Sequence, residues 1–430
     1  MRLLVGSLLT GLLCWPGQPA LSEPLSLKQC YERAIAESNQ LKIRGQEVLI
    51  AEAQYQQAMA ELYPEIFLEG FQRYRDNEDF GSISSGSFDD PSSGMRRSRS
   101  LGRSQFEGLI TVSQPLFRGF QELLFAEASK TEARSFVLEK ERDRQLLLSD
   151  AADLYFQILL LQDQKNVISE IENTLRKRIT ELQEFLKLGK SRESEVLAAE
   201  GDVALQILLR TRTERALAAA REVMGSLIGI KAESVELAVA HPAGLPEPVE
   251  TLLARLDQRP DLRAKTELQR SLELSAEAES RSYWPSLSLD SAAYPYEDPD
   301  RNRDWEVGLR LNVPIYQGGR IDARISEIEA QRGLVRYQQD EILRLAKRDL
   351  RESFQKLNGS LAEIQRAIEL REKRRKNYES QRHDYTLGVV TNLEVLNALA
   401  ELQNSELELL QARSAAALER VRLDVIVGDF

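Results

Sequence analysis

The chain has 430 residues with 57 basic and 68 acidic side chains, and a net charge of −11 without a basic tract argues against a nucleic-acid partner. Two histidines, and no G-x-S-x-G, P-loop or G-x-G-x-x-G motif, leave no catalytic residue, metal site or cofactor to predict. We expect His241 and His383 to be ordinary surface side chains. An aromatic content of 7%, with abundant Glu, Arg, Leu, Gln and Ala, favours long helices.

The first 22 residues are typical of a secretory signal peptide. Arg2 is followed by the apolar run 3–13 and by Ala20-Leu21-Ser22, a small-x-small cleavage site. The apolar run is too short for a membrane anchor. A lipoprotein signal at Cys14 is disfavoured because leucine precedes it where a small residue is needed. Cleavage after residue 22 would leave Cys30 as the one cysteine, which cannot form an internal disulfide.

Residues 23–229 are predicted to form the first structural half. A helix leads to strands at about 65–75 and 103–113, and the segment 76–103 between them, rich in Ser, Gly, Asp and Arg, indicates a long polar loop. From Gly119 a helix of about 70 residues is expected, with a turn at 188–192 where Ser191 would cap the returning helix.

Residues 230–249 contain four prolines or glycines and are predicted to link the two halves. The second half, 250–430, should hold a helix, strands at about 286–296 and 303–313, and a second helical hairpin. Its turn is expected at 387–392, with Thr391 and Asn392 as candidate caps of the last helix.

The two halves repeat each other. Three pairs of segments share one offset of 199 residues (314 − 115 for the first): Gln114-Pro115-Leu116-Phe117 with Val313-Pro314-Ile315-Tyr316, Leu188-Gly189 with Leu387-Gly388, and Leu227-Ile228-Gly229 with Ile426-Val427-Gly428. A constant offset indicates a tandem duplication. Tyr63-Pro64 matches Trp284-Pro285 at a larger offset, so the first half carries about 22 extra residues, which the polar loop accounts for.

Heptad spacing supports long paired helices. Apolar residues lie seven apart in the first half (Leu154, Leu161, Ile168, Leu175, Leu182) and alternate four and three apart in the second (Leu350, Phe354, Leu357, Leu361, Ile364, Ile368). Such a stripe faces a partner helix. The stripes end at Gly189 and Gly388, and glycine suits a helix C-terminus. Each half therefore predicts an antiparallel hairpin whose first helix is roughly 100 Å long.

The strands alternate between apolar and polar side chains, as in a sheet that faces lipid on one side and water on the other. The clearest run is Trp305 to Val313, and each run is about ten residues long, enough to cross a bilayer when tilted. Four prolines are predicted at helix–strand junctions, where the missing N–H does least harm: Pro64, Pro115, Pro285 and Pro314. Four strands cannot close a barrel, and open strand edges are not tolerated in lipid, so several chains must combine.

At this point the chain resembles the TolC-type outer-membrane efflux family. The resemblance rests on the duplicated strand-to-helix motif (114–117 and 313–319), the duplicated Gly-x5-Glu-Val at the hairpin turns, and Arg259-Pro260-Asp261-Leu262. It implies a mostly α fold with membrane β structure: a homotrimer with a twelve-stranded β-barrel, four strands per chain, continued by a long periplasmic α-helical barrel. The linker 230–249 would lie at an equatorial collar.

The resemblance also implies function and partners. The protein would be a passive exit duct in the outer membrane, supplied by an inner-membrane pump and a periplasmic adaptor, with no chemistry of its own. Adaptor contacts would lie at the hairpin tips, at Gly189, Lys190, Gly388 and Val389. The exported substrate is left open, because the pump selects it.

The resemblance also implies a periplasmic gate, which can be compared with the family residue by residue. Glu394 and Asn397 fall where the family's reference channel has two aspartates of an acidic constriction, and Tyr385 matches a gate tyrosine. Val390 replaces an arginine that ties the closed state, and Glu195 is the repeat equivalent of Glu394. The alternative for both glutamates is an ordinary acid at a helix start, which the helix dipole favours.

A second interpretation of the whole chain is a periplasmic helical scaffold or adaptor without a membrane barrel. Adaptors carry long hairpins but have no need of duplicated membrane strands, so the apolar strand faces favour the channel.

Overall fold

The computed structural model describes residues 24–74, 104–238, 244, 246–296 and 304–428. The predicted signal peptide, most of the polar loop and His241 lie outside the described residues. Within them the chain forms one four-stranded sheet and a set of long helices, in two compact units that are described separately. None of the described helices combines the length and the apolar character that crossing a membrane requires.

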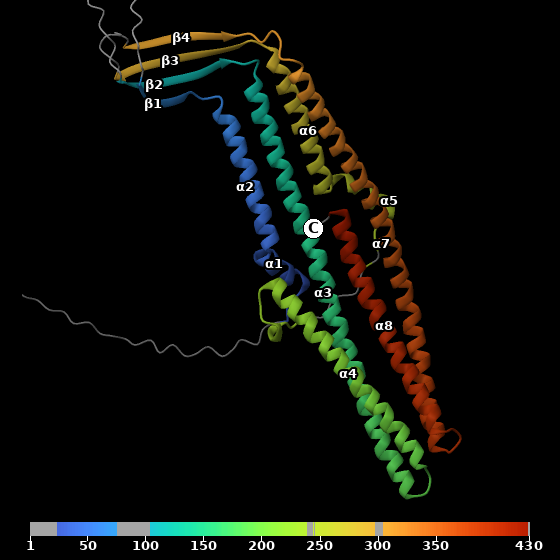
Figure 1. Cartoon of the computed structure of the whole chain (residues 1–430). Coiled ribbons are helices and arrows are strands. Elements are labelled where there is room, and N and C mark those ends of the chain that lie inside the picture. The colour runs from blue at the N-terminus through green and yellow to red at the C-terminus, as the bar shows by residue number, and fades with distance from the viewer. Residues whose placement is uncertain (1–23, 75–103, 239–243, 245, 297–303, 429–430) are drawn as a thin grey trace, which may run out of the picture. The chain divides into compact units, whose positions relative to one another are not determined.

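The sheet belongs to the second unit, which consists of residues 44–139 and 261–341. Its strands are β1 (Glu65–Tyr74), β2 (Ser104–Phe117), β3 (Ser286–Tyr296) and β4 (Trp305–Asn312). They pair antiparallel in the order β1-β2-β3-β4, and Figure 1 shows β1 and β4 at the two edges. Among the described residues each edge strand pairs on one side only.

The register separates the side chains of the sheet into two faces. Thr111 pairs with Phe67 and with Ala292, and Ala292 pairs with Glu306, so these positions share what we call the polar face. The opposite, apolar face holds alternate residues of all four strands: Ile66, Leu68, Ile110, Val112, Leu287, Leu289, Val307, Leu309 and Leu311. Leu68 is 78% exposed and Leu309 67% exposed, so this greasy surface is uncovered in the single chain.

Three of the four prolines lie beside strands, as expected. Pro64 and Pro285 directly precede β1 and β3, and Pro314 follows β4. Pro115 differs, because it lies inside β2, two residues before the strand ends, and pairs with Ser288 at a register shift. The shift accommodates a residue that cannot donate to the ladder, so β2 continues four residues beyond the predicted end at 113.

The helices of the second unit continue the strands. They are most of α2 (Asn39–Ala60), α6 (Pro260–Ser280) and the first parts of α3 (Gln121–Lys187) and α7 (Arg320–Thr386). Lys265 on α6 contacts Glu139 on α3 at 3.0 Å, and the Gln339 amide of α7 donates to the Leu262 carbonyl of α6 at 3.1 Å.

The first unit holds α1 (Leu27–Glu37), α4 (Glu193–Ile228), α5 (Val249–Arg255), α8 (Asn392–Val427) and the remaining parts of α3 and α7. Apolar side chains of α3 and α4 bury one another, among them Ile158 and Met224, and α7 and α8 do so through Leu350, Leu357 and Leu423. The paired helices match in length, with 67 residues in α3 and α7 and 36 in α4 and α8.

The linker docks against the short segment that precedes α1. Leu25 and Leu237 form a parallel bridge, and the Tyr155 hydroxyl of α3 donates to the carbonyls of Ala238 and Leu25 at 2.7 and 3.3 Å. Cys30 of α1 is fully buried beside them, and burial raises the pKa of its thiol to about 11.

Candidate functional site

The candidate site lies at the turns of the two hairpins. Gly189 and Gly388 have φ of +68° and +75°, in the left-handed region that glycine adopts without strain. The N–H of Lys190 donates to the carbonyl of Phe185 at 2.8 Å, and that of Val389 donates to Asp384 at 3.0 Å. Both turns therefore end a long helix with the same six-to-one hydrogen bond.

The tips expose the residues predicted for adaptor contact. Gly189, Lys190, Gly388 and Val389 are all exposed, and Leu188 and Val389 are 67% and 73% accessible. Exposed apolar side chains at a helical turn suit contact with another protein. The two turns differ in charge: residues 188–192 include Lys190 and Arg192, whereas the equivalent residues 387–391 carry no charged side chain.

An apolar cluster joins the two hairpins just behind their turns. It contains side chains of α3, α4 and α8 that are each less than a tenth exposed, with Tyr378 and Tyr385 of α7 packed against them: Ile171, Leu175, Leu182, Val196, Ala199, Val203, Leu396 and Leu399. Figure 1 shows α4 and α8 running alongside each other toward the turns. The apolar surface that these side chains bury holds the two hairpins of one chain together.

Tyr385 and Glu195, both predicted for the gate, meet across the hairpins. The Tyr385 hydroxyl donates to the Glu195 carboxylate at 3.1 Å, and the Ser191 hydroxyl donates to the same oxygen at 2.7 Å. Burial, and then the Glu195 charge, raise the pKa of Tyr385, so the phenol stays a donor at neutral pH. Ser191 was expected to cap α4, but the N-cap position is Arg192, and Ser191 instead positions Glu195.

Two further residues complete this contact and were not predicted for it. The Arg178 guanidinium of α3 donates to the Asn392 side chain at 3.0 Å, and its central carbon lies 3.9 Å from the centroid of the Tyr385 ring. The Asn392 amide donates to the Glu195 carbonyl at 3.4 Å. We call Arg178, Ser191, Glu195, Tyr385 and Asn392 the tip network.

Arg178 is a charged side chain in an apolar seam. It is 7% exposed and falls at a heptad position between buried neighbours (Ile168, Ile171, Leu175 and Leu182). It also donates to Glu181 at 3.0 Å, and its remaining nitrogen, Nη2, is buried without a hydrogen-bond partner. A buried charge in a helical seam is costly and is retained where it specifies a pairing. This interruption of the heptad pattern is the signal by which the sequence could have identified it.

The other predicted gate residues do not join the tip network. Glu394 is exposed and forms a capping box, accepting from the Thr391 N–H at 2.6 Å and from the Thr391 hydroxyl at 2.9 Å. These two bonds hold the pKa of Glu394 below its usual value, so it is ionised at neutral pH. Asn397 is exposed one turn later, and Val390 is half-buried.

Comparison with known proteins gives the family. A sequence model of the outer membrane efflux protein family matches residues 30–229 and 253–429. The outer membrane protein TolC of Escherichia coli K12 is 21% identical over 314 residues, covering 67% of this chain and 62% of that protein. The cation efflux system protein CusC of Escherichia coli O6:H1 is 24% identical over 431 residues, covering 94% and 85%.

A solved structure agrees with this assignment at the level of the fold. The outer membrane protein VceC of Vibrio cholerae superimposes with a TM-score of 0.77 at 15% identity, covering 94% of this chain and 96% of that one. The match of the family model over most of the sequence means that the resemblance inferred from the repeated motifs is correct. The chain belongs to the outer membrane efflux protein family.

Proposed function

We propose that three copies of this chain form an outer-membrane channel, with one twelve-stranded barrel and a periplasmic helical tunnel, which serves as a passive exit duct. The observation that carries the proposal is the sheet, whose apolar face is exposed and whose edge strands β1 and β4 each lack a partner on one side among the described residues. In lipid an open edge leaves backbone groups unpaired at several kcal/mol each. Pairing β4 of one copy with β1 of the next removes every edge.

Each copy would contribute two equivalent helical hairpins to the wall of the tunnel. The equal lengths of α3 and α7, and of α4 and α8, agree with the 199-residue offset between the halves. Three copies then supply six hairpins, and a helix of 67 residues is about 100 Å long.

In this proposal an inner-membrane pump supplies the energy and the substrate. A periplasmic adaptor would bind the exposed tips and connect the channel to the pump. Family membership disfavours the alternative of an adaptor or scaffold, and the strands with their uncovered apolar face disfavour it independently. The family comprises outer membrane efflux proteins, which is compatible with a chain that has no chemistry of its own.

The tip network is proposed to hold the periplasmic end of the tunnel closed. It joins the two hairpins of one copy, so separating them breaks the bonds of Glu195 to Tyr385 and Asn392 and exposes the apolar cluster behind them. Arg178 would stabilise the closed state in place of the arginine that Val390 replaces. Glu394, exposed and ionised, lines the mouth as a ring of three carboxylates, with Asn397 contributing a neutral side chain one turn further.

The assembly can be tested by measuring the mass of the purified protein in detergent after the detergent contribution is subtracted. We expect three chains, recovered from the outer-membrane fraction. A stable monomer that partitions into the soluble periplasm would contradict the proposal.

A further inference from the structure

A contact inside the chain joins its two halves where the sheet meets the helices. A Cβ atom added to Gly119, at the β2–α3 junction, would lie 3.1 Å from the Cβ of Trp284, at the α6–β3 junction. The ring centroids of Phe117 and Trp284 are 6.3 Å apart, and the Gln121 amide donates to the Ser282 hydroxyl at 3.0 Å. This internal junction contact accompanies the pairing of β2 with β3.

The duplication places equivalent residues at the two edges of the sheet. The β4–α7 junction repeats the β2–α3 junction at 199 residues, since α3 and α7 begin at 121 and 320. The α2–β1 junction repeats the α6–β3 junction at 221 residues, since β1 and β3 begin at 65 and 286. Tyr316 therefore takes the place of Phe117, and Tyr63 takes the place of Trp284.

The edge residues of this set are uncovered in the single chain. Tyr316 is 86% exposed and Tyr63 is 63% exposed. Gly318 corresponds to Gly119, but no atom lies within 4 Å of the position that its Cβ would take. The two edge junctions thus carry the parts of a contact whose other half is supplied only by another copy of the chain.

The neutral polar pair of the internal junction contact is replaced at the edges by opposite charges. Gln121 corresponds to Arg320 and Ser282 corresponds to Glu61, and both charged side chains are exposed. Neither charge suits its own helix, because Arg320 begins α7 at the positive end of the helix dipole and Glu61 directly follows α2 at the negative end. A contact between the two would offset both unfavourable placements.

We propose that a second copy of this chain docks its α2–β1 junction on the β4–α7 junction of the first, with Tyr63 against Tyr316 and Glu61 paired with Arg320. The inference rests on the proposed trimer, in which β4 of one copy pairs with β1 of the next as β2 pairs with β3. Three such contacts align neighbouring copies where the barrel meets the helices.

Reversal of the two charges tests the pair. Channels that carry two different affinity tags are mixed in detergent, and the rate at which both tags enter one particle is measured. Arg320→Glu and Glu61→Arg should each speed this exchange roughly tenfold, because three contacts change at once, and the double variant should restore the slow rate. The Debye length falls to about 3 Å at 1 M salt, so the differences should shrink there.

The direction of this effect separates the contact from a change within one chain. Each single reversal places a charge that its own helix dipole favours, so an effect confined to the chain would not weaken the assembly.

Two adjacent glycines give a second, steric test. Gly318 and Gly319 have φ of +63° and +77°, and both have open space around them in the single chain. Gly319 corresponds to Phe120, which has φ of +63° and a 61% exposed side chain. We expect Gly319→Phe to leave the trimer intact and Gly318→Phe to release single chains, with the same helix content by circular dichroism in both.

The outcomes distinguish failure of this contact from failure of the trimer. A wild-type protein with the mass of one chain would contradict the trimer itself. If the wild type has the mass of three chains, the junction contact is overturned by single reversals that leave exchange unchanged at low salt, by a double variant that does not restore it, or by equal behaviour of the two glycine variants.

Discussion

Replacing Arg178 by methionine tests the tip network at its least expected member. The substitution keeps an unbranched side chain in the seam but removes the guanidinium from Asn392 and from the Tyr385 ring. The lost charged hydrogen bond contributes about 1.5–3 kcal/mol and the cation–π contact about 0.5–2 kcal/mol. The pair with Glu181, which is 45% exposed, adds little.

Part of this lost stabilisation is offset. The buried Nη2 nitrogen has no partner, and removing it relieves a cost of about 1–3 kcal/mol. The net destabilisation of the closed tip should be about 2 kcal/mol per chain, which corresponds to roughly a 30-fold shift toward separated hairpins. The fold of the hairpins should survive, because the apolar cluster around the site is intact.

The assay is single-channel recording in planar bilayers. Arg178→Met should raise the time spent in high-conductance states by an order of magnitude or more. Arg176→Met is the matched control: it lies half a turn away, is 54% exposed, and its ion pair is with Glu172 of the same helix. A trimeric Arg178→Met channel with the wild-type distribution of conductance states would refute the gating part of the argument.

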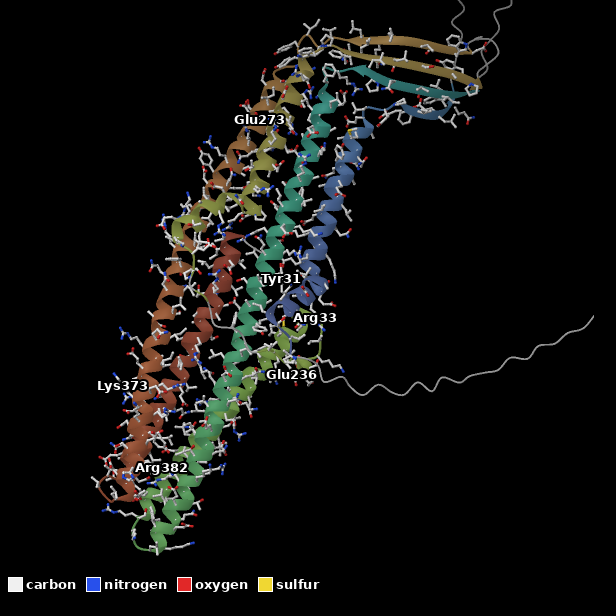
Figure 2. The ribbon with its side chains drawn as sticks, turned by 180° about the vertical axis from the view of Figure 1, so that it is seen from behind. Tyr31, Arg33, Glu236, Glu273, Lys373 and Arg382 are labelled. Carbon is white, nitrogen blue, oxygen red and sulfur yellow. The ribbon has the colours of Figure 1, made fainter. Side chains whose placement is uncertain are left out.

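Three other outcomes are expected. Multivalent cations added on the periplasmic side should block conductance, and Glu394→Gln should weaken that block. The control Glu273→Gln on α6 (labelled in Figure 2) should leave the block unchanged. If Glu394→Gln also leaves it unchanged, Glu394 is only a helix-capping acid. The polar loop 76–103 is expected to join the first two strands at the end away from the helices and so to face the outside of the cell. An epitope inserted near Ser85 should therefore be labelled on intact cells, and labelling only after the outer membrane is opened would reverse the topology. The pKa of the Cys30 thiol is raised from 9.0 to about 11 in the folded state, so its contribution of about 2–3 kcal/mol should be complete below pH 9 and lost between pH 9 and 11. Cys30→Ala should flatten the unfolding free energy measured by denaturant across that interval, and an unchanged slope would show that another group titrates there.

The architecture could be predicted because the signals were periodic and repeated. The heptad stripes marked α3 and α7, the glycines at 189 and 388 marked both turns, and two-residue alternation separated the faces of β3 and β4. Details that depend on a partner across space were missed. Pro115 was placed at a junction because its missing donor disfavours a strand, but pairing with Ser288 at a register shift accommodates it within β2.

The candidate site was predicted in part for the same reason. Tyr385 and Glu195 were identified through the resemblance and are in contact, at 3.1 Å. Arg178 and Asn392 lie 214 residues apart, and no local pattern shows that the arginine reaches the start of α8. Ser191 was predicted to cap α4 because serine is a preferred N-cap residue. The N-cap position falls one residue later, at Arg192, and the Ser191 hydroxyl donates to the Glu195 carboxylate instead.

The central claim is that β4 of one copy pairs with β1 of the next, and interchain disulfides test it most directly. Cysteines are introduced in pairs, one at Leu68 or Gly70 in β1 and one at Val307 or Leu309 in β4, which β2 and β3 keep apart within one chain. Neighbouring antiparallel strands bring facing Cα atoms to about 5.5 Å, within the range of a disulfide. At least one pair should oxidise to a covalent ring with the mass of three chains. Failure of all pairs to cross-link, or a ladder that continues past three chains, would contradict the closed trimeric barrel.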